Sequence, residues 1–297
     1  MTQLQGGGLS IERMCQLAQV SRAGFYRRWQ EMAPSEEETQ LRHLLQELAL
    51  RNKHYGYRRL GVLLRRVGHV VNHKRVRRLM REDNLLCLRQ RKFVPATTDS
   101  RHRWRVYPKL ARWLEPLAVN QLWVADITYV RLRRSFAYLA VILDAYSRRA
   151  VGWAMADHLE ASLALDALAM ALARREVPRG GLVHHSDRGV QYACGAYIER
   201  LEQSGIQPSM SRVGCPYDNA MAESFMRTLK QEEVDGRRYA DLAEARQSIE
   251  TFLAEVYNRQ RLHSALAYQS PDEYEANAVR VAAAAQQPLL EPNRDCV

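Results

Sequence analysis

Two hydrophobic patterns divide the chain. Before about residue 90, apolar residues recur every three or four positions in 41–50 (LRHLLQELAL), 55–67 (YGYRRLGVLLRRV) and 73–83 (HKRVRRLMRED). This spacing is typical of amphipathic helices, which bury one face. From about residue 120 the apolar residues form short continuous runs rich in β-branched and aromatic side chains, which favours strands. The sequence therefore predicts a helical first part and a second part built on a sheet.

Three strand-like runs follow one another in the second part, at 121–132, 135–147 and 149–156, and short turns separate them. Such a succession indicates an antiparallel meander. The elements expected after it are a helix at 160–175, a strand at 181–186, a helix at 196–205, a strand at 206–210, a helix around Glu223 and a long helix from about Asp241 to Tyr257. Paired strands followed by alternating helices and strands predict an α/β fold, with a mixed sheet flanked by helices.

The helical part is expected to form two small all-α regions. Residues 1–35 resemble a helix-turn-helix, with Ser21 as the expected N-cap of its second helix, and either DNA contact or a purely structural role fits them. Residues 36–90 form a basic helix-turn-helix domain. The further divisions are a basic linker at 91–117, a core at 118–279 and a tail at 280–297, which is expected to be only partly ordered after Ala278.

Positive charge changes the picture of the first part. The formal net charge is +11, yet residues 51–112 alone hold 19 Lys and Arg against three acids, a net charge of +16. Charge this concentrated repels itself without a polyanionic partner, so it favours DNA over the alternative of a solvated basic surface. The candidate phosphate contacts on the two expected helices are Arg58, Arg59, Lys74, Arg75, Arg77 and Arg78. In the linker, Trp104 and Tyr107 either stack on bases or pack against the core.

The cysteines, the first residues and the apolar runs indicate the compartment in which the protein works. The five cysteines show neither a CxxC pair nor zinc-ligand spacing, and the first residues show no signal-peptide pattern. The longest apolar run, at 136–143, is too short to span a bilayer. We therefore expect a soluble, reduced, cytoplasmic protein with no membrane partner.

Three acids stand out because they lie within or beside apolar runs: Asp126 in WVADITYV, Asp187 in HHSDRGVQY and Glu223 in DNAMAESFMRTLK. The first two have 60 residues between them, and the last two have 35. Burying a lone carboxylate is costly, and a divalent cation shared by three of them is the simplest compensation. A metal site of this kind predicts a phosphoryl-transfer enzyme.

The helix around Glu223 adds candidates. At about 100° per residue, Asn219, Arg227 and Lys230 lie on the same stripe as Glu223, beside a separate apolar arc. Cations beside a carboxylate suit a site that holds metal and DNA backbone together. The plain alternatives remain open: an exposed Glu223–Arg227 pair, an ordinary turn at Asp187, and an Asp126 that is salt-bridged to an arginine.

The order Asp, Asp, 35 residues, Glu and a basic residue seven positions later resembles the DDE signature of retroviral integrases and bacterial transposases. Longer motifs resemble the OrfB subunit of the IS-three group of insertion sequences: NQLWVADITYV, LDAYSRRAVGW, HHSDRGVQY, CPYDNAMAESFMRTLKQE and YNRQRLHSALAYQSPDEY. The resemblance covers most of the chain and implies an RNase H-like integrase core.

The resemblance implies that Asp126, Asp187 and Glu223 bind two Mg²⁺ ions, or Mn²⁺ in their place, about 4 Å apart. Water would free a 3′-OH at the element's end, and that 3′-OH would attack a second DNA strand. Lys230 matches the family's basic residue after the glutamate and would contact end DNA, while Asn219 and Arg227 are weaker matches for the same role. The zinc module of the retroviral relatives is not evident here.

The partners implied are double-stranded DNA at element ends and target, further copies of this chain on DNA, and an upstream OrfA subunit or a frameshift fusion with it. Two other functions remain: a sequence-specific DNA-binding regulator without catalysis, and another RNase H-like nuclease. Asp144 is expected to end its strand and cap the next turn. For His184 and His185, a position behind the carboxylates, a DNA-facing position and a plain strand position all fit.

Overall fold

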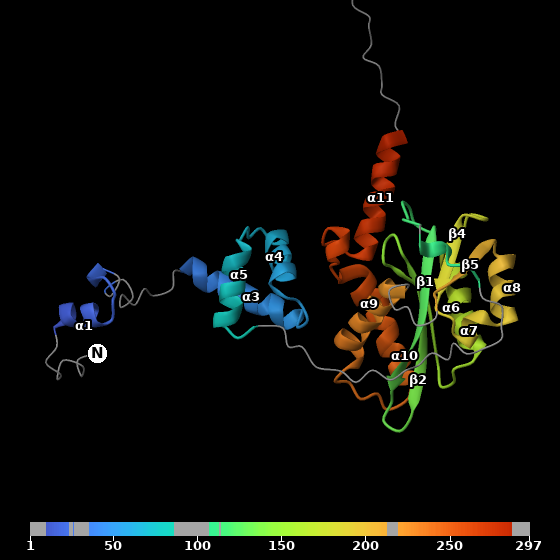
Figure 1. Cartoon of the computed structure of the whole chain (residues 1–297), viewed down its shortest axis with the longest axis horizontal. Helices are drawn as coiled ribbons and strands as arrows, with labels where there is room; N and C mark the ends of the chain where they lie inside the picture. Colours follow the sequence, from blue (N-terminus) through green and yellow to red (C-terminus); the bar gives the residue numbers. More distant parts are fainter. Residues whose placement is uncertain are drawn as a thin grey trace, which may run out of the picture. The chain divides into compact units, whose positions relative to one another are not determined.

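The computed structural model describes residues 10–23, 26, 36–85, 107–112, 114–212 and 219–286 (Figure 1). Contacts divide the chain into two units, Met1–Cys87 and Leu88–Val297. The expected helical first part and sheet-containing second part are confirmed. Most of the expected second N-terminal helix, and the linker around Trp104, fall outside the described residues.

In the first unit, helix α1 spans Ile11–Leu17, and the Ser10 hydroxyl accepts a hydrogen bond from the amide of Arg13 as its N-cap. Three further helices are α3 (Glu36–Arg51), α4 (Tyr57–Arg66) and α5 (His73–Glu82). A turn through Gly68 separates α4 from α5, and its φ of 91° favours glycine. The small core of these three helices comprises Leu41, Leu45, Leu60, Leu64, Val76, Leu79 and Met80.

The second unit is built on a five-stranded sheet in the order β3-β2-β1-β4-β5. The strands are β1 (Leu122–Arg131), β2 (Phe136–Asp144), β3 (Ala150–Ala156), β4 (Leu182–Ser186) and β5 (Ile206–Met210). β1, β2 and β3 form the expected antiparallel meander, whereas β4 pairs with β1 in parallel and β5 with β4 in parallel. The predicted mixed sheet is confirmed.

Helices cover both faces of this sheet (Figure 1). Side chains alternate along β1, so that Val124 joins one core layer and Trp123 the other. The first layer includes α9 (Ala220–Leu229), α10 (Leu242–Thr251) and the π-helical stretch η5 (Phe252–Gln260). The second includes α6 (Ala161–Arg174), α7 (Val190–Ala193) and α8 (Gly195–Gln203). The remaining short elements are η2 (Leu110–Arg112), η4 (Lys230–Val234) and η6 (Ser264–Leu266).

A further helix, α11 (Pro271–Gln286), was not expected, and it crosses the boundary placed between core and tail at 279/280. The tail up to Gln286 is helical, and the expectation for its remainder falls outside the described residues. Glu275 explains the helix, because its carboxylate accepts hydrogen bonds from the Ser147 hydroxyl (2.6 Å), Arg149 (2.9 Å) and Arg175 (2.6 Å). Burial acts to raise the pKa of Glu275, but these hydrogen bonds and the arginine charge stabilise its ionised carboxylate, so the pKa is lowered.

Tyr107 packs against the second core layer, and the amide of Leu110 donates to the Ser209 hydroxyl at 2.9 Å. The end of the expected linker is therefore part of the sheet unit. In the described part of the chain, no helix has the length and apolar character needed to cross a bilayer.

Candidate active site

Asp126 lies in the middle of β1, opposite Val141 of β2, and its side chain is half-buried. By alternation it faces the layer that contains α9. Its Oδ1 accepts a hydrogen bond from the amide of Ile127 at 2.9 Å. Among the described residues, Asp126 has no arginine in ion-pair contact, which disfavours the salt-bridge alternative for this residue.

Asp187 directly follows β4 and comes to the same edge of the sheet. The parallel register sets Trp123 opposite His184 and Val124 opposite His185. Asp126 and Asp187 each lie two residues beyond the last paired position, Val124 opposite His185, and the charge of Asp187 acts on Asp126. Asp187 Oδ1 accepts a hydrogen bond from the amide of Gly189 at 2.9 Å, which fixes the turn that leads into α7.

Glu223 comes from the first turn of α9, where its side chain is exposed. The predicted apolar arc of this helix is buried in the sheet layer, as Ala222, Phe225, Met226 and Leu229. The helix is tied to β1 by Asn219, whose Nδ2 donates to the carbonyl of Ala125 at 3.0 Å. Glu223 makes no ion pair with Arg227 within the part of the chain that the structure describes.

The three carboxylates influence one another electrostatically. The pKa of Asp126 is raised to about 7, mainly by burial and then by the negative charges of Asp187 and Glu223, while the Ile127 amide and Lys230 act in the opposite direction. Lys230 is held nearby, with its Nζ 4.1 Å from the centre of the Tyr129 ring. The fold thus brings together acids that are far apart in the sequence, and it adds the predicted lysine.

The chemistry of these donors suits a hard divalent cation, because all of them are carboxylate oxygens and their charges raise the cost of ionising Asp126. Among the residues described, no three acidic, histidine or cysteine side chains lie within reach of one ion. The side chain of Glu223 is exposed in this structure, whereas those of Asp126 and Asp187 are half-buried.

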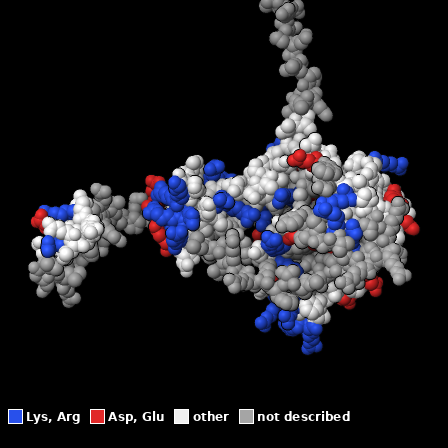
Figure 2. Space-filling model, in the orientation of Figure 1, with Lys and Arg blue, Asp and Glu red and all other residues white. Residues whose placement is uncertain are grey.

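The other predicted site residues differ in surroundings. Asn219 is buried with its amide on β1, so it positions α9 in this structure, whereas Arg227 is exposed and Lys230 half-buried. On α5, Arg75 and Arg78 lie 3.7 and 3.9 Å from Glu38 of α3. Figure 2 shows the blue side chains over α5 with acidic side chains beside them.

Arg58 and Arg77 instead flank an aromatic ring. Their guanidinium groups lie 5.5 and 6.0 Å from the centre of the Tyr57 ring, and Arg59 lies 5.2 Å from that of Tyr55. Lys74 is exposed at the start of α5, where its amide donates to the N-cap Asn72. The six predicted phosphate contacts therefore divide into arginines that face acids and cations that face aromatic rings or water.

Both strand histidines are buried, which excludes a DNA-facing position in this structure. His185 bonds the hydroxyls of Ser209 (2.9 Å) and Ser211 (3.1 Å), and His184 Nε2 bonds the Tyr197 hydroxyl (3.0 Å). Asp144 behaves as predicted: it is fully buried at the end of β2, and it accepts from the amides of Asn120 (2.7 Å) and Tyr146 (2.9 Å).

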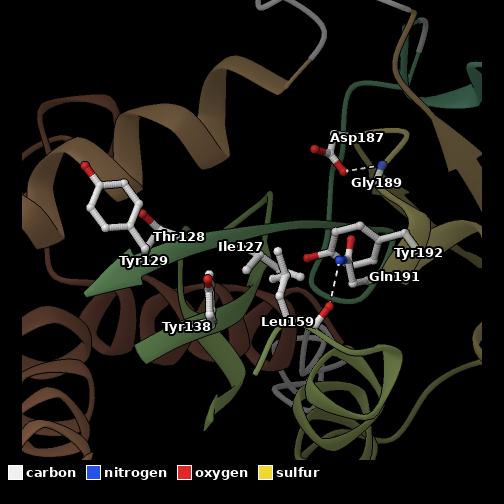
Figure 3. A pocket seen from close by; sticks show the side chains of 9 residues that line it. All are labelled: Ile127, Thr128, Tyr129, Tyr138, Leu159, Asp187, Gly189, Gln191 and Tyr192. Atoms are coloured by element: carbon white, nitrogen blue, oxygen red, sulfur yellow. Dashed lines mark hydrogen bonds between the residues drawn. The ribbon is translucent and has the colours of Figure 1, made fainter. Parts of the chain in front are cut away.

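The structure adds a tyrosine that the sequence argument passed over. Tyr192, in the short helix α7, lines a cavity beside Asp187 (Figure 3). The lining residues are Ile127, Thr128, Tyr129, Tyr138, Leu159, Asp187, Gly189, Gln191 and Tyr192. The sequence offered one signal for this tyrosine, namely its place in HHSDRGVQY shortly after Asp187. An aromatic residue in that position looks like an ordinary core residue, however.

Comparisons with known proteins agree with this architecture. Two family models described as Integrase core domain match residues 116–216 and 204–271, and one described as HTH-like domain matches residues 36–93. The HTLV-2 integrase catalytic core domain in complex with magnesium is 14% identical, covers 54% of this chain and 99% of its own, and has a TM-score of 0.41. A likeness this weak carries no weight in the assignment.

The sequence relatives are much more similar. The insertion element IS600 uncharacterized 31 kDa protein of Shigella sonnei is 41% identical over 275 residues, which span 91% of this chain and 100% of the relative. Transposase InsF for insertion sequence IS3A of Escherichia coli (strain K12) is 36% identical, across 90% of this chain and 94% of its own. The family expected from the sequence motifs is confirmed: the chain belongs to the insertion-sequence transposases with an integrase core domain, the family of IS3 transposase InsF.

Proposed function

We propose that this chain cuts and joins DNA strands as a DDE transposase, with Asp126, Asp187 and Glu223 as the reacting centre. One observation carries the assignment of these residues. The parallel pairing of β1 with β4 brings two aspartates to the same edge of the sheet, and the Glu223 charge from α9 acts on the same buried carboxyl group. Three converging acids would repel DNA, so a DNA-binding regulator without catalysis has no use for them.

The residues of the site have separate roles in the reaction. Asp126 and Asp187, at the sheet edge, and Glu223 of α9 would hold the divalent cations, with Mg²⁺ preferred and Mn²⁺ as a substitute. Those cations supply charge neutralisation at the attacking and leaving oxygens of an in-line displacement at phosphorus. Lys230 lies beside Asp126 with its ammonium group over Tyr129, a position from which it can contact a phosphate of the bound end.

Two displacements follow from this chemistry. Water first attacks the phosphodiester at the end of the element and frees a 3′-OH. That hydroxyl then attacks a phosphodiester of a second strand, and one P–O bond forms as another breaks. No covalent enzyme intermediate takes part, since the nucleophile in each step is an oxygen of water or DNA.

DNA is held by the helical unit as well as by the core. Arg58, Lys74 and Arg77 are the better phosphate contacts, because Arg75 and Arg78 already face Glu38. Arg59 and Arg227 are secondary contacts, and Asn219 serves by fixing α9 to β1. Further copies of this chain and an OrfA subunit are the protein partners we propose, in a bacterial cytosol.

The test uses the full chain and a duplex that carries the terminal repeat of its own element. Asp126→Asn and Glu223→Gln should each abolish Mg²⁺-dependent end cleavage and strand transfer while the protein still binds the duplex. Asp166→Asn is the matched control, because Asp166 is an exposed acid on α6 and should tolerate the change. Cleavage by either active-site variant at the wild-type rate would overturn the assignment, and binding without cleavage by the wild type would favour the regulator.

A further inference from the structure

Tyr192 carries a buried hydroxyl group with no hydrogen-bond partner. Its side chain is 3% exposed, and its Oη is among the buried polar atoms of the described residues that have none. An unpaired buried hydroxyl costs about 1–3 kcal/mol, so a fold normally avoids it or uses it. In Figure 3 the ring lies behind Gln191, with its hydroxyl end towards the cavity and Ile127.

The cavity provides a place for what this hydroxyl could bind. β4 ends at Ser186 whereas β1 continues to Arg131, so β4 leaves one side of residues 127–129 uncovered, and the cavity lies there. It offers about 20 Å³ to the centre of a water molecule, which is room for about one water. A buried water needs two to four polar partners, and Asp187, Thr128, Gln191 and Tyr192 are all in the lining.

The two aspartates act on this tyrosine. Burial raises the pKa of Tyr192 well above its ordinary value, and the charges of Tyr197, Asp126 and Asp187 raise it further. The hydroxyl therefore keeps its proton and acts as a donor. This hydroxyl faces a water-sized space beside Asp187. It can orient a water molecule there by donating a hydrogen bond to a lone pair of the water oxygen.

We propose that Tyr192 is a positioning residue for the attacking water of the first displacement. This inference rests on the proposed function and deepens it. The water oxygen forms a bond to phosphorus as the bond from phosphorus to the 3′ oxygen breaks. The leaving 3′ oxygen gains a proton and the attacking water loses one to solvent, so that one water is consumed. The second displacement uses a DNA 3′-OH that is held by its own strand, and it does not need the Tyr192 hydroxyl.

Tyr197 lies next to Tyr192 and provides a matched control for it. It is buried in the same cluster, with its ring 5.4 Å from that of Tyr192 in an edge-to-face contact, but its hydroxyl is bonded to His184 Nε2 at 3.0 Å. Tyr197→Phe thus removes a hydrogen bond that supports the core, whereas Tyr192→Phe removes none of those described. The two variants make the same chemical change and should have opposite consequences.

The experiment measures two reactions of the full-length protein with Mg²⁺: cleavage of an uncut element end, and strand transfer from an end supplied already cut. Tyr192→Phe should lower end cleavage by roughly ten- to a hundredfold, which is the loss of one hydrogen bond in the reacting complex. Strand transfer from the cut end should stay within about twofold of wild type. Its melting temperature should match wild type, while Tyr197→Phe should melt a few degrees lower and keep its ratio of cleavage to transfer.

Equal rates of end cleavage in Tyr192→Phe and wild type would overturn the proposal, as would equal losses in both reactions. If Tyr192→Phe were less stable, the ratio of cleavage to transfer would still decide, because both reactions use the same folded protein. A wild-type protein that performs neither reaction with any divalent cation, alone or together with its OrfA subunit, would instead refute the proposed function, so the two failures can be told apart.

Discussion

The basic helices α4 and α5 and the acidic edge of the sheet both concentrate charge of one sign, but they place it differently with respect to water. Arg58, Lys74 and Arg77 lie at the surface, where solvent screens each charge and a partner can reach it. Asp126 is half-buried, and its charge meets those of Asp187 and Glu223. Exposed charge of this kind suits attraction of DNA from a distance, whereas buried charge suits a fixed chemical task. Four pairs of substitutions test this difference between exposed and buried charge.

The largest effect should separate the half-buried Asp187 at the sheet edge from the buried Asp144. Asp187→Asn should reduce end cleavage by at least about a thousandfold with little change in stability, because the Asn oxygen can still accept the Gly189 amide. Asp144→Asn should leave the catalytic steps intact but destabilise the core, since one oxygen of Asp144 caps the turn after β2 at Tyr146 and the other accepts from the amide of Asn120 before β1. Cleavage rates and urea unfolding of both variants check this. Similar losses of activity in the two would show that burial alone, and not position at the edge, decides the effect.

Ion pairs should show the same dependence on burial. Arg261 holds Glu232 through two bonds of 2.8 and 2.9 Å, and both side chains are about nine-tenths buried. Arg261→Ala leaves the buried Glu232 carboxylate without this partner and should lower the free energy of unfolding by about 3–5 kcal/mol. Arg259→Ala removes an exposed pair with Glu255 and should cost at most about 1 kcal/mol. Equal costs in urea titrations would contradict the expectation.

Burial also predicts a pH dependence of stability. Desolvation, helped by His185, lowers the pKa of His184 to about 3, whereas the unfolded chain binds this proton near the ordinary value of 6.5. The neutral histidine therefore contributes stability that is present above pH 6.5 and is lost as the pH falls towards 3, at about 1.4 kcal/mol per pH unit. His184→Gln should flatten this part of the curve of unfolding free energy against pH. His43→Gln is the matched control for the substitution itself, because the His43 side chain is exposed on α3.

The smallest effect concerns neighbouring arginines of α5. Arg77→Ala should weaken DNA binding by about fivefold and reduce the slope of affinity against salt by about one, as expected for one phosphate contact. Arg78→Ala should change affinity by less than about twofold, because Arg78 lies near Glu38 and Glu82. Titrations of the full chain with duplex DNA at several salt concentrations distinguish them. A larger loss from Arg78→Ala would mean that DNA displaces the acids.

Much of the sheet unit was predictable because its signals are local. Three apolar runs separated by turns gave the meander, and the buried arc of α9 followed from helical periodicity. The acids could be chosen because each interrupts an apolar run. What could not be predicted depends on contacts between distant segments. The proximity of Glu38 to Arg75 requires the packing of α3 on α5, and the burial of Asn219 requires the docking of α9 on β1.

Two further misses have the same cause. The helix α11 carries no strong apolar stripe, and its position is fixed by the bonds of Glu275 to residues more than 90 positions earlier. Tyr192 is an ordinary aromatic residue in sequence, and only its unpaired hydroxyl and the cavity beside Asp187 distinguish it from a core tyrosine.

The late position of Glu275 has a consequence for how the protein is made. A ribosome completes α3, α4 and α5 long before it reaches α11, and a chain released before Glu275 leaves Arg149 and Arg175 without their shared carboxylate. We expect such a shortened product to keep the helices that attract DNA while lacking a finished sheet unit. It would then occupy element ends without cutting them, so that incomplete translation would supply an inhibitor of the complete protein.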